Sequence, residues 1–177
     1  MNHPCPHARA RGESGVALVE FALILPLLML ILLGILDFGR AFNYWLDQTH
    51  IANEGSRWAI VNTNPGTSSL QKYLQCSADT NELKNGGTSS VPDPLTVTIS
   101  FPLNPSTGTS GQVGDPVAVT TSTKFNLLPF IGKAASNPTG LNLTASSIMR
   151  LEQPPTYLAG DGGPGPGKTG LGGTPCP

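Results

Sequence analysis

The most constraining feature of this sequence is a long apolar stretch near its N-terminus. All residues of the range 16–36 are apolar except Glu20, Pro26 and Gly34. Because an α-helix rises about 1.5 Å per residue, the stretch would span roughly 32 Å, which matches a bilayer hydrocarbon core of about 30 Å. It is longer than the roughly 7–15 apolar residues of a cleaved secretory signal. We therefore predict a retained transmembrane helix, with a kink or loosened turn at Pro26.

Glu20 is the ionisable residue inside this stretch. A charge near the centre of a membrane helix costs about 2.5–3.5 kcal/mol by insertion scales, and such residues usually mark function. Two interpretations are open: the carboxylate reaches water at the membrane surface, or it has a dedicated partner. The second is favoured by position, because Glu20 is the fifth residue after Gly15, at the head of a long apolar helix.

The head of the chain, GESGVALVEFALILPLLMLILLGILDFGRAF, resembles the opening of TadE-like pilus assembly proteins in its VEFAL, its proline and its DFGR exit. The segment LNLTASSIMRLE is similar to the final strand of that family. The resemblance implies a type IV pilin-like subunit of a tight-adherence system, cut by a prepilin peptidase after Gly15 to expose Val16. It implies that Glu20 pairs with the N-terminal amine of a neighbouring subunit. The expected partners are that peptidase, other pilin-like subunits, the pilus assembly machinery and the lipid bilayer.

The flanks of the apolar stretch predict its orientation. Arg9 and Arg11 lie on the N-terminal side, and positive residues in short flanks favour the cytoplasm. We expect residues 1–15 to be a cytoplasmic leader and the C-terminal domain to be periplasmic or extracellular, on a single pass through the bacterial inner membrane. The domain is larger than a short major pilin would need, which favours a minor pilin or pseudopilin. The alternative is an unprocessed single-pass anchor with a periplasmic interaction domain in an envelope complex.

Helical periodicity continues beyond the membrane stretch, through residues 37–61. One stripe at helical spacing is mostly apolar and is expected to pack against the following domain: Phe38, Phe42, Trp45, Thr49, Ala52, Ser56 and Ala59. A second stripe is polar and is expected at the surface: Arg40, Asn43, Asp47, His50, Glu54 and Arg57. We predict one helix from about Val16 to Val61, ended by Asn64-Pro65-Gly66.

Residues 62–152 predict a small α+β domain. A short helix is expected near Leu70 to Leu74. Alternation of apolar and polar residues predicts strands at about 95–101, 117–125 and 141–151. The predicted fold class is α+β, in which the long N-terminal helix packs on an antiparallel sheet of about three strands. The apolar segment 127–132 fits the core better than the membrane surface. Residues 153–177 are rich in Gly and Pro and predict a flexible tail.

The remaining composition narrows the function classes. A net charge of −1 gives no broad basic surface for nucleic acid. No phosphate loop, GxSxG or HExxH motif is present in the sequence, so we expect a structural protein with no catalytic site, cofactor, metal or small-molecule substrate. Removal of the leader takes away Cys5 and leaves Cys76 and Cys176. In an oxidising compartment these two either form a disulfide or stay as free or intermolecular thiols.

Overall fold

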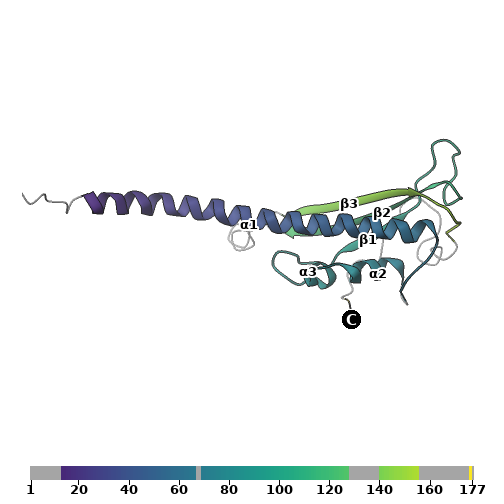
Figure 1. The fold of residues 1–177 in the computed structure, drawn as a ribbon, viewed down its shortest axis with the longest axis horizontal. Coiled ribbons are helices and arrows are strands. Elements are labelled where there is room, and N and C mark those ends of the chain that lie inside the picture. Colours follow the sequence, from purple (N-terminus) through teal and green to yellow (C-terminus); the bar gives the residue numbers. More distant parts are fainter. Residues whose placement is uncertain (1–12, 67–68, 128–139, 156–175, 177) are drawn as a thin grey trace, which may run out of the picture. The chain divides into compact units, whose positions relative to one another are not determined.

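The computed structural model describes residues 13–66, 69–127, 140–155 and 176 of the chain. It has a long helix α1 (Glu13–Ile60), two short helices α2 (Leu70–Ser77) and α3 (Asn81–Asn85), and three strands (Figure 1). The predicted α+β class is confirmed, with one long N-terminal helix and a small antiparallel sheet. The chain divides into two compact units, one ending at Asp37 and the other beginning at Phe38.

The C-terminus of α1 is set by a left-handed residue. Asn62 has φ of +50°, a conformation that asparagine tolerates better than most residues. Its N–H donates to Ala59 O at 3.2 Å, and the Thr63 N–H donates to Trp58 O at 3.1 Å. These two hydrogen bonds form a Schellman motif, which satisfies carbonyls left open at the end of a helix. The helix therefore ends at Ile60, before the predicted Asn64-Pro65-Gly66 stop.

The three predicted strands are confirmed: β1 (Thr96–Ser100), β2 (Pro116–Asn126) and β3 (Gly140–Arg150). They form one sheet in the order β1-β2-β3, and both pairs are antiparallel. Ile99 lies opposite Val119, which in turn lies opposite Ser147. This register places the residues that alternate along each strand on two distinct faces of the sheet.

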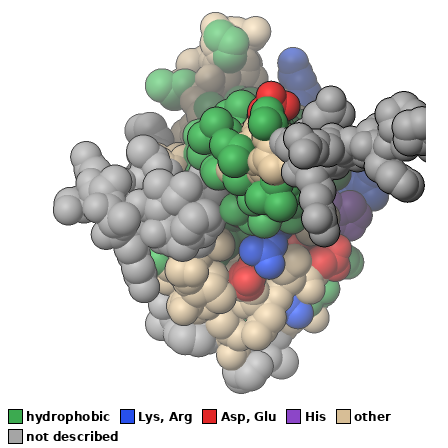
Figure 2. Space-filling view, turned by 90° about the vertical axis from the view of Figure 1, so that its left-hand side faces the viewer, with side chains coloured by type: hydrophobic (Ala, Val, Ile, Leu, Met, Phe, Trp, Pro, Cys, Tyr) green, Lys and Arg blue, Asp and Glu red, His purple; other side chains and the backbone are tan. Residues whose placement is uncertain are grey.

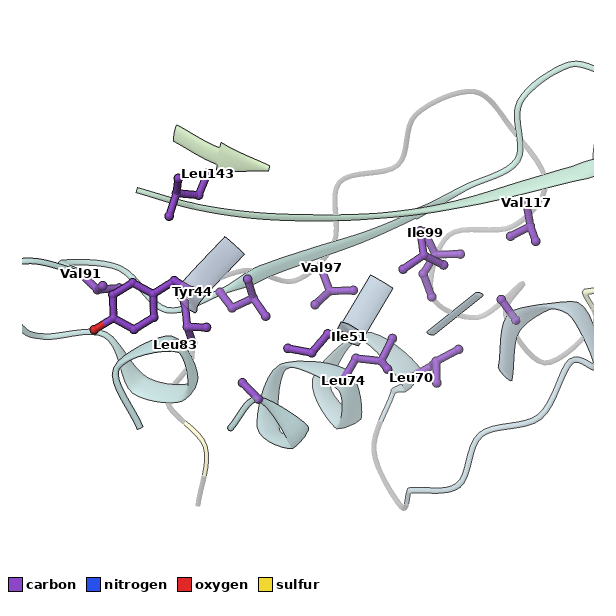
Figure 3. Packing of buried hydrophobic residues seen from close by; sticks show 14 of the residues in the cluster. Tyr44, Ile51, Leu70, Leu74, Leu83, Val91, Val97, Ile99, Val117 and Leu143 are labelled. Carbon is purple, nitrogen blue, oxygen red and sulfur yellow. The ribbon is translucent and has the colours of Figure 1, made fainter. Parts of the chain in front are cut away.

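The hydrophobic core lies between one face of the sheet and the helices α2 and α1, the latter from Phe38 onward (Figure 3). The largest fully buried apolar side chains come from every element except β3, and from the loop before β1. They are Ile51, Leu70, Leu74, Leu83, Val97, Val117, Val119 and Phe125, together with Val91 and Leu95 of that loop. A three-stranded sheet needs such a partner to be stable in water. The predicted packing of the helix on the sheet is thus present.

The side of α1 that faces the core differs in part from the prediction. Ala52, Ser56 and Ala59 are buried as expected. Phe38, Phe42 and Trp45 are not, because 69 %, 49 % and 41 % of their surfaces are exposed. Ala41, Tyr44, Gln48 and Ile51 are buried in their place. The physical reason is the Tyr44 ring, which packs against Phe125 of β2 with ring centroids 5.6 Å apart and so turns the neighbouring side of the helix to the sheet.

The polar stripe on α1 also needs one correction. Asp47 was expected at the surface, but it is only 9 % exposed. Its carboxylate accepts a hydrogen bond of 3.0 Å from the Asp79 N–H, in the turn between α2 and α3. This contact holds the turn against α1, which explains why an acidic side chain is buried there.

The segment between α1 and the sheet contains more helix than predicted. The short helix begins at Leu70, as expected, but it continues to Ser77; Ser69 Oγ accepts from the Lys72 N–H at 3.3 Å and caps its first turn. Helix α3 was not predicted from the sequence, and its single buried side chain is Leu83. The predicted tail lies outside the described residues except for 153–155 and Cys176. Of the segment 127–132, only Leu127 is described, and it packs against the core.

Candidate functional site

The N-terminal part of α1 is the first candidate site. Among the described residues, α1 is the one helix long and apolar enough to cross a membrane, and its most apolar window has no buried residue. Large apolar side chains between Val16 and Leu36 are exposed on all sides of the helix, and Figure 2 shows hydrophobic side chains gathered around it. Leaving apolar surface in water costs about 25 cal/mol per Å². This part of the chain therefore needs lipid or other protein chains around it.

The predicted processing residues lie at the start of this helix. Gly15 and Val16 are in the first turns of α1, which begins at Glu13. Nothing lies within 4 Å of the position that a Cβ at Gly15 would take. Glu20 is exposed and follows Val16 by four residues, so the two side chains share one side of the helix. Pro26 lies inside the helix. Cleavage, charge pairing and a kink at these positions stay predictions.

The second feature is a covalent link at the far end of the chain. Cys76 of α2 and Cys176 form a disulfide, with an S–S distance of 2.09 Å and Cα atoms 5.6 Å apart. The Cys176 N–H also donates to Asn85 Oδ1 at 2.7 Å. Cys176 is thereby fixed to the α2–α3 segment.

The contact of α1 with the domain depends on small and hydroxyl residues, of which Ser56 was predicted to face the domain and Gly55 was not. A Cβ added at Gly55 would meet Leu74 Cδ1 at 2.6 Å and Val119 Cγ1 at 3.1 Å, so the helix backbone approaches both side chains closely. Ser56 Oγ and Ser147 Oγ lie 2.9 Å apart in the interior. A glycine between buried helix positions is the signal that could have revealed this contact.

Two buried carboxylates in the domain have opposite electrostatic environments. Burial raises the pKa of Asp47 above its usual value, with the nearby Asp79 adding to the effect. The pKa of Asp115 is lowered, first by the hydrogen bond from Asn104 Nδ2 at 2.9 Å and then by those from the Gln112 N–H and the Thr109 hydroxyl, both at 3.0 Å. Through these contacts Asp115 organises the loop between β1 and β2.

An apolar N-terminal helix that continues into a small disulfide-bonded α+β domain defines a class of protein: a membrane-anchor candidate that carries a compact domain on the same helix. Residues 15–57 match the family model of TadE-like proteins, and the match begins at the predicted processing glycine. The chain is thus TadE-like over most of α1, which confirms its resemblance to this family of pilus assembly proteins. Members of the family are structural and assembly proteins rather than typical enzymes. No curated protein and no solved structure matches the chain.

Proposed function

We propose that this protein is a pilin-like membrane subunit, a minor pilin or pseudopilin, that takes part in assembling a tight-adherence-type pilus or a related secretion apparatus. The observation that carries the proposal is the exposed apolar half of α1, which bears one carboxylate, Glu20, and matches TadE-like proteins from Gly15 onward. A helix that only anchors a domain in lipid gains nothing from an acidic residue, whereas a helix that packs among its own kind can use one for pairing.

The proposed processing step supplies the partner for that carboxylate. A prepilin peptidase hydrolyses the peptide bond between Gly15 and Val16, and the new α-amine at Val16 is positively charged at neutral pH. In the assembled state this amine lies beside Glu20 of a neighbouring subunit. The ion pair offsets the cost of holding Glu20 in an apolar environment, because a buried charge is tolerated when it is paired.

The proposed orientation places the domain outside the cytoplasm, on a single pass through the bacterial inner membrane. The Cys76–Cys176 disulfide supports it, since disulfides persist in oxidising compartments such as the periplasm and are rare in the cytosol. Arg9 and Arg11 on the N-terminal side support it as well.

N-terminal sequencing of the full chain, purified from its native membrane, tests the processing step. The expected result is a mature chain that begins at Val16. Recovery of chains that still carry residues 1–15 from cells with a working pilus would contradict processing. That outcome would favour the alternative, an unprocessed anchor with a periplasmic interaction domain.

The variant Glu20→Ala tests the role of the carboxylate. Loss of one partner of a buried ion pair costs about 3–5 kcal/mol, so pilus output should fall at least tenfold while membrane insertion is unchanged. The matched control is Glu54→Ala, which removes another α1 glutamate, one that accepts from Trp58 Nε1 in the domain. Pilus output that is equal in the two variants and in the parent protein would refute the assigned pairing.

A further inference from the structure

Where α1 enters the domain, it has three distinct sides. One side is buried in the core, a second is exposed and polar, and a third is exposed and apolar. The polar exposed side carries Arg40, Asn43 and His50. The apolar exposed side, which we call the aromatic patch, consists of Phe38, Phe42, Trp45 and Leu46, each at least 41 % exposed.

The aromatic patch is a continuous surface on one side of the helix. Counted from Phe38, its residues stand at i, i+4, i+7 and i+8, the spacing that gathers side chains into one stripe. The rings of Phe42 and Trp45 are in contact, with centroids 5.9 Å apart. Because the polar and the apolar exposed residues are separated around the helix, the two sides suit two different surroundings. Helices at a membrane surface show this separation, with Trp, Phe and Leu on the lipid side.

The position of the aromatic patch in the chain indicates what covers it. Phe38 lies only two residues after Leu36, where the apolar stretch ends. Trp and other aromatic residues are enriched where a membrane helix passes through the lipid headgroups. Contacts between membrane helices instead favour Gly, Ala, Ser and Thr, which let backbones approach closely, and the four residues of the patch are all large. Lipid therefore fits the patch better than the helix of a second chain.

The dimensions of a bilayer set the depth of the patch. The headgroup region adds about 5–7 Å to each side of the hydrocarbon core. If Leu36 marks the edge of that core, Phe38, Phe42 and Trp45 lie about 3, 9 and 13.5 Å beyond it along the helix axis. Helical side chains point back toward the N-terminus, which here is toward the bilayer. Membrane helices are tilted by about 20° on average, and a tilt toward the patch brings Trp45 within reach of the headgroups.

We propose that the aromatic patch lies in the headgroup region of the leaflet through which α1 leaves the membrane, and that α1 leans toward this side. Arg40, Asn43 and His50 then face water. The inference rests on the proposed single-pass anchor. It does not depend on cleavage after Gly15 or on the pairing of Glu20.

The test measures tryptophan fluorescence of the full chain in lipid nanodiscs that hold a single chain each. Bromine atoms on lipid quench a tryptophan that touches them, and they are placed either at the headgroup end or at the tail end of the acyl chains. The variant W58F leaves Trp45 as the one tryptophan. Its fluorescence should fall at least twofold with bromine at the headgroup end, and less with bromine at the tail end.

The matched control is W45F, which leaves Trp58. This residue packs against the core of the domain and lies about 20 Å farther along α1 than Trp45. Its fluorescence should be the same in brominated and in ordinary lipid. Unquenched Trp45, as expected if a second chain covers the patch in the assembled state, would overturn the proposal, and so would equal quenching of Trp45 and Trp58.

A third variant separates this inference from the anchor on which it rests. L28W/W45F/W58F places a lone tryptophan inside the apolar stretch, where bromine at the tail end should quench it most. If Trp45 is unquenched while this tryptophan is quenched, the patch proposal fails and the anchor stands. If the tryptophan introduced at Leu28 is also unquenched, both fail.

A pair of variants tests whether the apolar neighbours hold Trp45 at this depth. F38S/F42S/L46S/W58F should lose at least half of the quenching seen with W58F. R40S/N43S/H50S/W58F changes as many residues on the polar side and should keep it. Circular dichroism checks that both fold; if the first does not, the comparison of Trp45 with Trp58 decides alone. Equal quenching in the two folded variants would contradict the proposed role of the patch.

Discussion

At the scale of single residues, the domain holds two carboxylates that respond to pH in opposite directions. Asp47 is buried against the turn between α2 and α3, and its pKa is raised mainly by burial. Asp115 is 2 % exposed and accepts several hydrogen bonds, of which the one from Asn104 contributes most to its lowered pKa. Both side chains stabilise local structure through backbone or side-chain donors, but only Asp115 is stabilised in its charged form.

The signs of these pKa shifts predict opposite effects on stability for two substitutions. Because the folded pKa of Asp47 is raised, its contribution to stability is complete below the ordinary value of 3.8 and is lost as pH rises through the folded pKa. Asp47→Asn should therefore raise stability at pH 7 by up to about 1 kcal/mol, or roughly 2–4 °C in Tm. The amide oxygen can still accept from the Asp79 N–H.

Because the folded pKa of Asp115 is lowered, its contribution is present above 3.8 and is lost as pH falls through the folded pKa. Asp115→Asn should lower Tm at pH 7, since its amide N–H₂ would face groups that themselves donate. For both variants, the difference in Tm from the parent protein should shrink toward pH 3. Near-ultraviolet circular dichroism of the full chain in detergent, during heating at pH 7 and pH 3, measures them. A lower Tm for Asp47→Asn at pH 7, or no change for Asp115→Asn, would contradict this assignment.

At the scale of elements, one glycine permits the close approach of α1 to α2 and β2. A Cβ added at Gly55 would come within 3.1 Å or less of Leu74 and Val119, both of which are fully buried. Val119 is β-branched and stiff at χ1, and Leu74 is fully buried in the core. Helices α1 and α2 and the sheet therefore pack this closely because residue 55 has no side chain.

The variant Gly55→Ala tests this fit. Alanine gains about 1 kcal/mol of helix propensity over glycine, but overpacking a core costs about 1–3 kcal/mol. The expected net effect is a loss of about 1 kcal/mol. Gly39→Ala is the control, because Gly39 lies in the same helix with nothing within 4 Å of an added Cβ. That variant should gain roughly 0.5–1 kcal/mol. Urea unfolding measures both, and a Gly55→Ala protein as stable as Gly39→Ala would disprove the packing argument.

At the scale of the whole molecule, the sequence predicts the architecture better than the contacts. The three strands were predictable because apolar residues alternate with polar ones, strictly in β1 and less regularly in β2 and β3, which specifies a half-buried sheet. The side of α1 that faces the core was not predictable, because two adjacent stripes of residues both repeat with helical periodicity. The more aromatic one, with Phe38, Phe42 and Trp45, is exposed, and only the ring of Phe125 makes Tyr44 the inward residue.

The candidate sites also differ in how far the sequence alone could predict them. The sequence alone predicts a role for Gly15, Val16 and Glu20, because that role depends only on their spacing along one helix. The contact between Ser56 and Ser147 could not be found in this way, because it depends on how α1 packs against β3. Helix α3 was missed because five residues with one buried leucine give no periodic signal.

The Cys76–Cys176 bond closes a covalent ring with a sequence separation of 100, which contains α3 and all three strands. A protease that cuts the backbone once inside this ring opens it without dividing the polypeptide. Both resulting pieces stay joined to α1, one through the peptide chain and the other through the sulfur bridge. After a cut inside the ring, shedding of the sheet from its anchor requires a second cut or a reductant, so a single nick there leaves the domain in place.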